Sequence, residues 1–128
     1  MKIFVITPTY NEKKNIQELI EKIHNVNKQI NILVVDDNSP DGTHKIVQNL
    51  KKTFKNLHLL KRLKKDGLGS AYIAGMKYAL NENADIIIQM DADMSHDPES
   101  INDLLNKSKN YDLVIGSRYI SGINVVNW

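Results

Sequence analysis

The chain has 128 residues, of which 41% are hydrophobic and 25% charged, as in an ordinary globular domain. A formal net charge of +2 and an aromatic content of 6% argue against a nucleic-acid-binding surface. The absence of cysteine excludes disulfides and thiolate metal sites. Because no apolar segment approaches the roughly 18 to 20 residues of a membrane span, and the first apolar run is too short for a signal peptide, we expect a cytoplasmic protein.

Apolar runs typical of buried strands alternate with helical patterns from end to end. Strands are predicted at residues 3–6, 32–35, 57–60, 86–90 and 113–115. Helices are predicted at residues 16–23, 46–54 and 71–80, and a further helix begins at Asp97-Pro98-Glu99 with an aspartate cap. This alternation predicts an α/β fold with a mostly parallel sheet covered by helices on both faces.

Polar clusters follow four of the predicted strands, where the apolar runs end. They are Pro8-Thr9-Tyr10-Asn11-Glu12, Asp36-Asp37-Asn38-Ser39, Asp91-Ala92-Asp93 and Gly116-Ser117-Arg118. In a parallel α/β sheet, ligands bind beyond the carboxyl ends of the strands, near the position where the strand order reverses. We therefore expect the four clusters to converge on one edge of the sheet and to form one site.

Asp91 and Asp93 end an apolar run, with one small residue, Ala92, between them. Two bare carboxylates this close raise each other's pKa, and a bound divalent cation removes that penalty. Mg²⁺ and Mn²⁺ prefer carboxylate oxygens and keep positions for water and substrate phosphates, so the pair indicates chemistry on a phosphorylated substrate. Ser95 could add a hydroxyl ligand, whereas His96 is more typical of a loop residue. The alternative is a solvated turn before a helix cap.

Asp37 follows a second buried strand, where nucleotide-binding folds place a carboxylate that accepts hydrogen bonds from ribose hydroxyls. Residues 39–42 are typical of a turn and helix cap, and we interpret them as structural. Tyr10 could lie against a flat base, and Glu12 could accept hydrogen bonds from the N–H groups of that base. An exposed turn before a helix is the alternative for both.

The segment at residues 61–69 is basic at its start and glycine-rich at its end. Tyr72 stands where a dinucleotide-binding fingerprint requires a glycine, which excludes that motif. The segment is either a solvated face or a loop that meets an anionic substrate or a negatively charged membrane. Arg118 follows a strand and a glycine, and its planar guanidinium suits a phosphate at this edge.

Five motifs, in order along the chain, together resemble glycosyltransferase family 2, and within it the polyprenyl-phosphate sugar synthases of the dolichol-phosphate mannosyltransferase type. They are Pro8-Thr9-Tyr10-Asn11-Glu12, Val35-Asp36-Asp37-Asn38-Ser39-Pro40-Asp41-Gly42-Thr43, Gly67-Leu68-Gly69-Ser70-Ala71-Tyr72-Ile73-Ala74-Gly75-Met76, Met90-Asp91-Ala92-Asp93-Met94-Ser95-His96 and Gly116-Ser117-Arg118-Tyr119. The acidic pairs are typical of the whole family. The second and third motifs narrow the resemblance to the polyprenyl-phosphate sugar synthases, and fit the mannose type best.

The resemblance implies an A-type glycosyltransferase fold, a Rossmann-like three-layer sandwich. Residues 1–128 would be the N-terminal, nucleotide-sugar-binding part of a catalytic domain that is truncated here. The implied reaction transfers mannose from GDP-mannose to dolichyl or another polyprenyl phosphate, with inversion and with Mg²⁺ or Mn²⁺.

The resemblance also implies roles for individual residues. Asp91, Asp93 and Arg118 would be catalytic, and Asp91 and Asp93, with Ser95 where some members use glutamine, would bind the metal. The substrate-binding set would be Pro8, Tyr10, Glu12, Val35 and Asp37 around the guanosine, and Asp91, Ala92, Asp93 and Arg118 around the phosphates.

The implied setting is the cytosolic face of a membrane, that of the endoplasmic reticulum in a eukaryote, where the protein would be peripheral. The implied partners include a membrane-anchoring segment or subunit outside this chain, and no nucleic acid. Three alternatives stay open: transfer of glucose or N-acetylglucosamine instead of mannose, a non-catalytic nucleotide-binding fragment, and a phospho-accepting receiver domain. A receiver would carry its acid pair after the first strand, where this chain has residues 8–12.

Overall fold

The structure, a computed structural model, describes residues 1–114. Its strands are β1 (Ile3–Thr9), β2 (Asn31–Asp36), β3 (Leu57–Lys61) and β4 (Ile86–Gln89). Its helices are α1 (Ile16–Val26), α2 (Thr43–Leu50), α3 (Leu68–Asn81), a 3₁₀ turn η1 (Pro98–Ser100) and α4 (Ile101–Ser108). The first four predicted strands are confirmed. Leu113 and Val114, predicted to start a fifth strand, lie in irregular structure, and the rest of that prediction falls outside the described residues.

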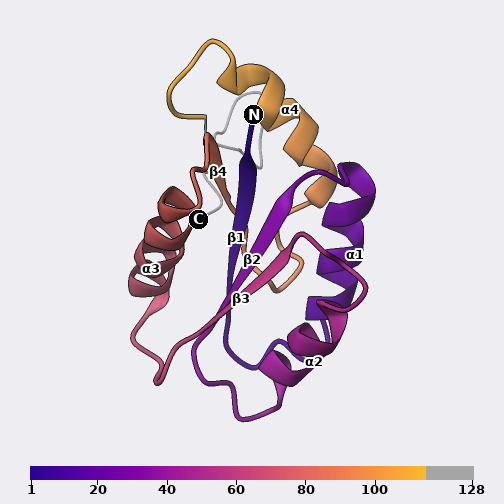
Figure 1. Ribbon diagram of the computed structural model, residues 1–128, viewed down its shortest axis with the longest axis vertical. Coiled ribbons are helices and arrows are strands. Elements are labelled where there is room, and N and C mark those ends of the chain that lie inside the picture. The colour runs from indigo at the N-terminus through magenta and orange to yellow at the C-terminus, as the bar shows by residue number, and fades with distance from the viewer. Residues whose placement is uncertain (115–128) are drawn as a thin grey trace, which may run out of the picture.

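The four strands form one parallel sheet in the order β3-β2-β1-β4 (Figure 1). The chain moves outward from β1 to β2 and β3 and then returns to pair β4 with the other side of β1. The strand order therefore reverses beside β1. A ligand site is expected at this reversal, beyond the carboxyl ends of β1 and β4.

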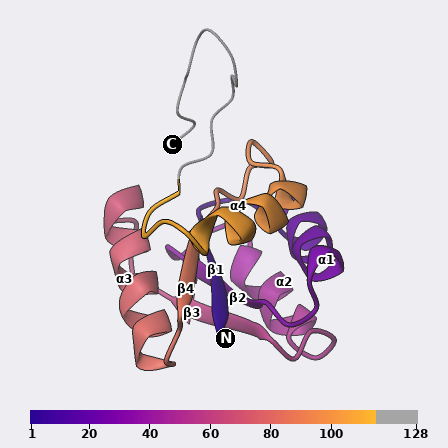
Figure 2. The same ribbon diagram turned by 90° about the horizontal axis from the view of Figure 1, so that it is seen from above.

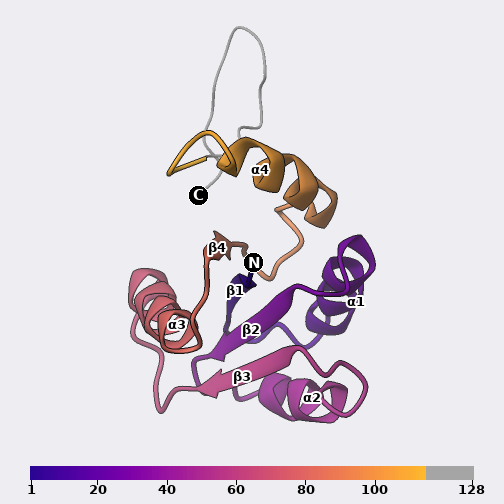
Figure 3. The same ribbon diagram turned by 45° about the horizontal axis from the view of Figure 1, so that its top comes forward.

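Helices cover both faces of the sheet, which confirms the three-layer prediction. Figures 2 and 3 show α3 on one side and α1 and α2 on the other. Alternate residues of each strand point to opposite faces of the sheet and pack into the two hydrophobic cores, one on each face. Val5, Val34 and Ile88 pack with buried residues of α1, α2 and α4, whereas Ile6 and Leu33 pack beneath α3.

α3 lies very close to the sheet because it carries a glycine at the contact. A Cβ atom at Gly75 would stand 2.6 Å from Cγ2 of Ile6 and 3.1 Å from Cγ2 of Val35. The absence of a side chain lets the helix approach β1 and β2. One turn earlier, this approach brings Ala71 and Tyr72 to the carboxyl edge of the sheet.

Several helix boundaries differ from the predicted ones by a turn. α2 ends at Leu50, and Phe54 lies in the turns that follow, where its N–H donates to the Leu50 carbonyl. The predicted cap at Asp97 is confirmed, since its carboxylate accepts from the Glu99 N–H at 3.0 Å. Within residues 1–114, no helix combines the length and the apolar character needed to cross a bilayer.

Candidate functional site

A cleft of about 260 Å³ lies at the carboxyl edge of the sheet, next to the reversal of strand order. Its walls come from the end of β1, from the segments that follow all four strands and from the start of α3. The lining residues are Pro8, Thr9, Tyr10, Glu12, Asp37, Lys65, Gly67, Leu68, Ala71, Asp91, Ala92 and Asp93. Three of the four predicted clusters therefore converge as expected. The fourth, with Arg118, lies outside the described residues.

The loops after β1 and β2 are joined by side chains that accept hydrogen bonds from backbone N–H groups. The Asn11 N–H donates to Oγ of Ser39 at 2.9 Å, and the Glu12 N–H donates to Oγ1 of Thr43 at 3.1 Å. Asn11 has a φ of 58°, in the left-handed region that asparagine tolerates. The turn at residues 39–43 is thus structural, as predicted, and it also shapes the neighbouring loop.

Asp36 holds this pair of loops from inside the protein. Its carboxylate is wholly buried and accepts from the Thr9 hydroxyl at 2.7 Å, from the Ser39 N–H at 3.0 Å and from the Ser39 hydroxyl. Three donors compensate the burial of the carboxylate. Asp36 therefore joins the end of β1 to the loop after β2 and does not line the cleft.

Asp37, its neighbour, lines the cleft but already has a cationic partner. Oδ1 of Asp37 lies 2.9 Å from Nε of Arg62, and both side chains are largely buried. The backbone N–H of Arg62 donates to the backbone carbonyl of Asp36 at 2.8 Å. This bond fixes the start of the loop after β3 beside the loop after β2. The parallel register of β2 and β3, which aligns Asp36 with Lys61, brings Arg62 to Asp37. The sequence alone does not indicate this ion pair, because its two residues lie in different loops.

Tyr10 and Glu12 both reach the cleft from the loop after β1. The Tyr10 ring is 39% exposed and carries Nζ of Lys65 4.4 Å from its centroid, a cation–π contact. Glu12 accepts from Nδ2 of Asn15 at 3.1 Å, and its carbonyl accepts the N–H of Ile16 as α1 begins. Both residues therefore have room to meet a ligand, and Lys65 is an additional cleft residue.

Asp91 is positioned by α3 and by the turn that follows β4. The Tyr72 hydroxyl donates to Oδ1 of Asp91 at 2.8 Å, and the Asp91 N–H donates to Nδ1 of His96 at 3.0 Å. Burial, reinforced by the bond to Asp91, raises the pKa of Tyr72 far above its ordinary value, so the phenol stays a donor. The tyrosine that excludes a dinucleotide fingerprint thus orients an acidic residue of the site. Its place in the sequence does not indicate this contact.

Asp93 is exposed and stays ionised. Hydrogen bonds from the Ser95 side chain and from its backbone N–H, at 3.0 Å to Oδ1, lower the pKa of Asp93 below its ordinary value despite partial burial. The sequence predicted a raised pKa for this carboxylate, and the prediction is wrong for Asp93, because these hydrogen bonds outweigh the effect of burial. Ser95 contacts Asp93, and its role as a metal ligand stays a prediction.

The acidic pair fits a hard divalent cation by its chemistry. Asp91 and Asp93 supply carboxylate oxygens to the same cleft, and diphosphate or water oxygens can complete the shell of Mg²⁺ or Mn²⁺. In the described part of the chain, no three acidic or histidine side chains gather closely enough to hold a metal unaided.

The remaining predicted residues differ in position. Pro8 and Ala92 line the cleft. Val35 is wholly buried beneath α3, next to Gly75. The burial of its side chain does not support the predicted contact with substrate.

This fold and this cleft define a class: a parallel α/β domain with an acidic cleft at the reversal of strand order. Residues 4–128 match the family model described as glycosyl transferase family 2. The chain belongs to glycosyltransferase family 2.

Two relatives are similar over the whole chain. Undecaprenyl-phosphate mannosyltransferase of Micrococcus luteus is 41% identical over 128 residues, which are 100% of this chain and 53% of that protein. Dolichol-phosphate mannosyltransferase of Pyrococcus furiosus is 44% identical over 131 residues, covering 100% of this chain and 36% of that protein. The chain thus spans about half or less of the length of these relatives.

Two solved structures resemble the fold. TarS of S. aureus superimposes with a TM-score of 0.75 and 26% identity, over 98% of this chain and 38% of that one. A mannosyltransferase of Pyrobaculum calidifontis, in complex with GDP-Man and Mn²⁺, superimposes with a TM-score of 0.57 and 29% identity, over 61% of this chain and 24% of that one. Together with the family match, these establish the A-type glycosyltransferase fold for this chain.

Proposed function

We propose that residues 1–128 are the N-terminal, nucleotide-sugar-binding part of an enzyme that transfers mannose from GDP-mannose to dolichyl or another polyprenyl phosphate. The observation that carries the proposal is the meeting of Tyr10, Glu12 and Asp37 with Asp91 and Asp93 in one cleft. The similarity to polyprenyl-phosphate mannosyltransferases, and to a mannosyltransferase solved with GDP-Man and Mn²⁺, supports the choice of donor.

In this proposal the cleft divides into two parts. Tyr10, Glu12 and Asp37 bind the guanosine, the first by its ring and the other two by accepting hydrogen bonds. Asp91 and Asp93 hold Mg²⁺ or Mn²⁺, which supplies positive charge to a leaving diphosphate. Tyr72 orients Asp91 for that role, and Ser95 keeps Asp93 ionised.

The reaction needs little help with protons. An oxygen of the acceptor phosphate forms the new bond to C1 of mannose, the bond from C1 to the diphosphate breaks, and GDP leaves with inversion at C1. A phosphate acceptor is already an anion, so no general base is required. The remaining difficulty is repulsion between two anions, which the cationic side chain of Lys65 in the cleft and Arg118 would reduce.

The test is calorimetric titration of the chain with GDP and with UDP, each with and without Mn²⁺. We expect GDP to bind in a Mn²⁺-dependent manner and UDP to bind more weakly. Asp91→Asn and Asp93→Asn should remove the Mn²⁺-dependent part, whereas Asp103→Asn, an exposed carboxylate on α4, should not change it. Unchanged GDP affinity in both cleft variants would contradict the proposal.

Two outcomes would redirect the assignment. TarS, which matches the fold, has been solved with UDP, so a preference for UDP would favour a polyprenyl-phosphate glucose or N-acetylglucosamine synthase. GDP binding without turnover, in a protein extended by the half that the relatives possess, would favour a non-catalytic nucleotide-binding protein. If the proposal holds, the protein works peripherally at the cytosolic face of a membrane, with any anchoring segment or subunit outside this chain.

A further inference from the structure

The last residue of β3 and the loop that follows it carry a concentration of positive charge. Residues 61–66, called the basic loop below, contain two pairs of adjacent cations and one acidic residue, and carry a net charge of +3. The formal net charge of the whole chain is +2, so the remainder is slightly negative. A local excess of this kind attracts anionic partners to one place on the surface.

The basic loop also presents an apolar side chain to solvent. Leu63, in the middle of the cations, is 92% exposed, and Leu68, where α3 begins, is 53% exposed. A single exposed leucine is common on protein surfaces. A nearly fully exposed leucine flanked by cations is also the arrangement that binds where lipid headgroups meet acyl chains.

Side chains of the basic loop divide between two directions. Arg62 turns inward to pair with Asp37, which lines the cleft, and Lys65 lies over the ring of Tyr10 and lines the cleft itself. Lys61, Leu63 and Lys64 are exposed and do not line the cleft. We call these three side chains the outer triad.

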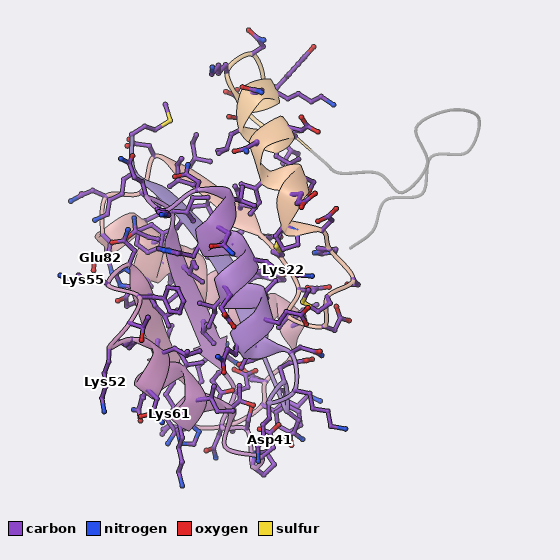
Figure 4. All side chains as sticks on the ribbon, turned by 90° about the vertical axis from the view of Figure 1, so that its right-hand side faces the viewer. Lys22, Asp41, Lys52, Lys55, Lys61 and Glu82 are labelled. Atoms are coloured by element: carbon purple, nitrogen blue, oxygen red, sulfur yellow. The ribbon has the colours of Figure 1, made fainter. Side chains whose placement is uncertain are left out.

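The outer triad lies at the end of the molecule that carries the cleft. Figure 4 shows Lys61 at the same end as Asp41, which belongs to the loop after β2, whereas Lys55 and Glu82 lie away from that end. A flat anionic surface that met the outer triad would therefore lie beside the mouth of the cleft.

We propose that the outer triad docks this protein onto an anionic membrane surface, with Lys61 and Lys64 at the lipid headgroups and Leu63 inserted between them. This deepens the function proposed above, on which it rests, because a lipid-linked phosphate acceptor reaches the cleft only from a membrane surface. A free phosphate ion would gain nothing from Leu63. The membrane is therefore the partner that accounts for all three side chains.

The experiment is cosedimentation of the chain with vesicles of phosphatidylcholine alone or mixed with phosphatidylglycerol, without nucleotide. We expect binding to the anionic vesicles only, weakened by salt.

Each lysine at an anionic surface changes partitioning about fivefold, so Lys61→Gln/Lys64→Gln should bind about 25-fold more weakly. Leu63→Ser should cost about tenfold. The control Lys55→Gln/Lys77→Gln removes equal charge from exposed positions outside the basic loop and should lose far less.

Insertion of Leu63 can be observed directly because the chain contains no cysteine. An environment-sensitive dye on Leu63→Cys should shift to shorter wavelength with anionic vesicles, and the same dye on Ala74→Cys, within α3, should not. Equal loss of binding in the loop and control variants, or no dye shift at residue 63, would overturn the inference.

Failure of this inference is distinguishable from failure of the proposed function. The outer triad lies outside the cleft, so its variants should bind GDP with Mn²⁺ as the unaltered chain does. Intact GDP binding without vesicle binding would refute membrane docking alone. Vesicle binding without GDP binding would refute the nucleotide site and leave membrane docking supported by the dye shift.

Discussion

The two halves of the cleft differ in how deeply the side chains that support them are buried. The half formed by the loops after β1 and β2 rests on buried polar residues, among them Asp36 and Thr43 at 0% exposure and Asp37 at 5%. The half formed by the turn after β4 rests on side chains at the surface: Asp91 is 25% exposed, and Asp93 and Ser95 are exposed. The first half is tied across two loops, whereas the second is held by α3 and by contacts within its own turn.

This difference in burial indicates which half of the cleft is already formed in the ligand-free protein. Buried hydrogen bonds that join segments far apart in sequence form with the fold itself and stabilise it. Exposed carboxylates at a turn contribute little to stability and are available to a cation. Substitutions in the β1–β2 half should therefore lower the stability of the fold, whereas substitutions in the β4 half should lower the affinity for the ligand.

The sharpest test of this contrast is Asp36→Ala. The change leaves the Thr9 hydroxyl and the Ser39 N–H without their acceptor inside the protein, and should lower the free energy of unfolding by about 3 kcal/mol. Urea denaturation followed by circular dichroism measures this loss. Asp93→Ala, the matched acidic residue of the other half, should change stability by less than about 1 kcal/mol. Similar losses of unfolding free energy in the two variants would contradict the proposed difference between the halves.

Arg62→Gln tests the charge balance beneath the β1–β2 half. Without the guanidinium, the largely buried Asp37 carboxylate has no cation, and we expect a loss of about 2 kcal/mol in unfolding free energy together with weaker GDP binding. Arg62→Lys keeps the charge and should recover most of the stability but less of the GDP affinity, since an ammonium cannot orient the carboxylate as a guanidinium does. GDP affinity unaffected by either change would show that Asp37 needs no positioning.

The same contrast separates what the sequence could predict from what it could not. Apolar runs ending in polar clusters predicted four strands, the parallel sheet and the convergence of residues 8–12, 37 and 91–93, because strand period and the edge rule act locally. The Arg62–Asp37 pair depends on the register of β2 and β3, and the Tyr72–Asp91 pair depends on the close approach of α3 that Gly75 allows. No local sequence pattern indicates either pair. The different positions of Asp36, bonded to Thr9 and Ser39, and of Asp37, in the cleft beside Arg62, depend on contacts that include residues from other segments of the chain.

A smaller effect is expected from Tyr72→Phe in the β4 half. The change removes only the hydroxyl that donates to Asp91, so stability should fall by about 1 kcal/mol or less. The Mn²⁺-dependent affinity for GDP should fall severalfold, because Asp91 is then free to rotate. Tyr78→Phe removes a hydroxyl from the same helix, where it contacts Nδ1 of His58 at 3.0 Å, and should leave GDP binding unchanged. Equal effects of the two changes on GDP affinity would mean that Tyr72 does not position Asp91.

The smallest predicted effect lies away from both halves and arises from His58. Its ring bridges Tyr78 of α3 and Asn31 of β2, and burial, with help from the charges of Lys2 and Lys51, lowers its pKa below the ordinary value. The unfolded chain therefore takes up this proton first as the pH falls, and the contribution of His58 to stability, fully present above about pH 7, declines as the pH drops through about 6.5. Urea titrations at about pH 7.5 and about pH 5.5 should show a smaller stability loss in His58→Gln than in the unaltered chain. Because His58 lies outside the cleft, GDP affinity at neutral pH should be the same in both proteins, and an equal pH dependence of stability in both would contradict the assignment.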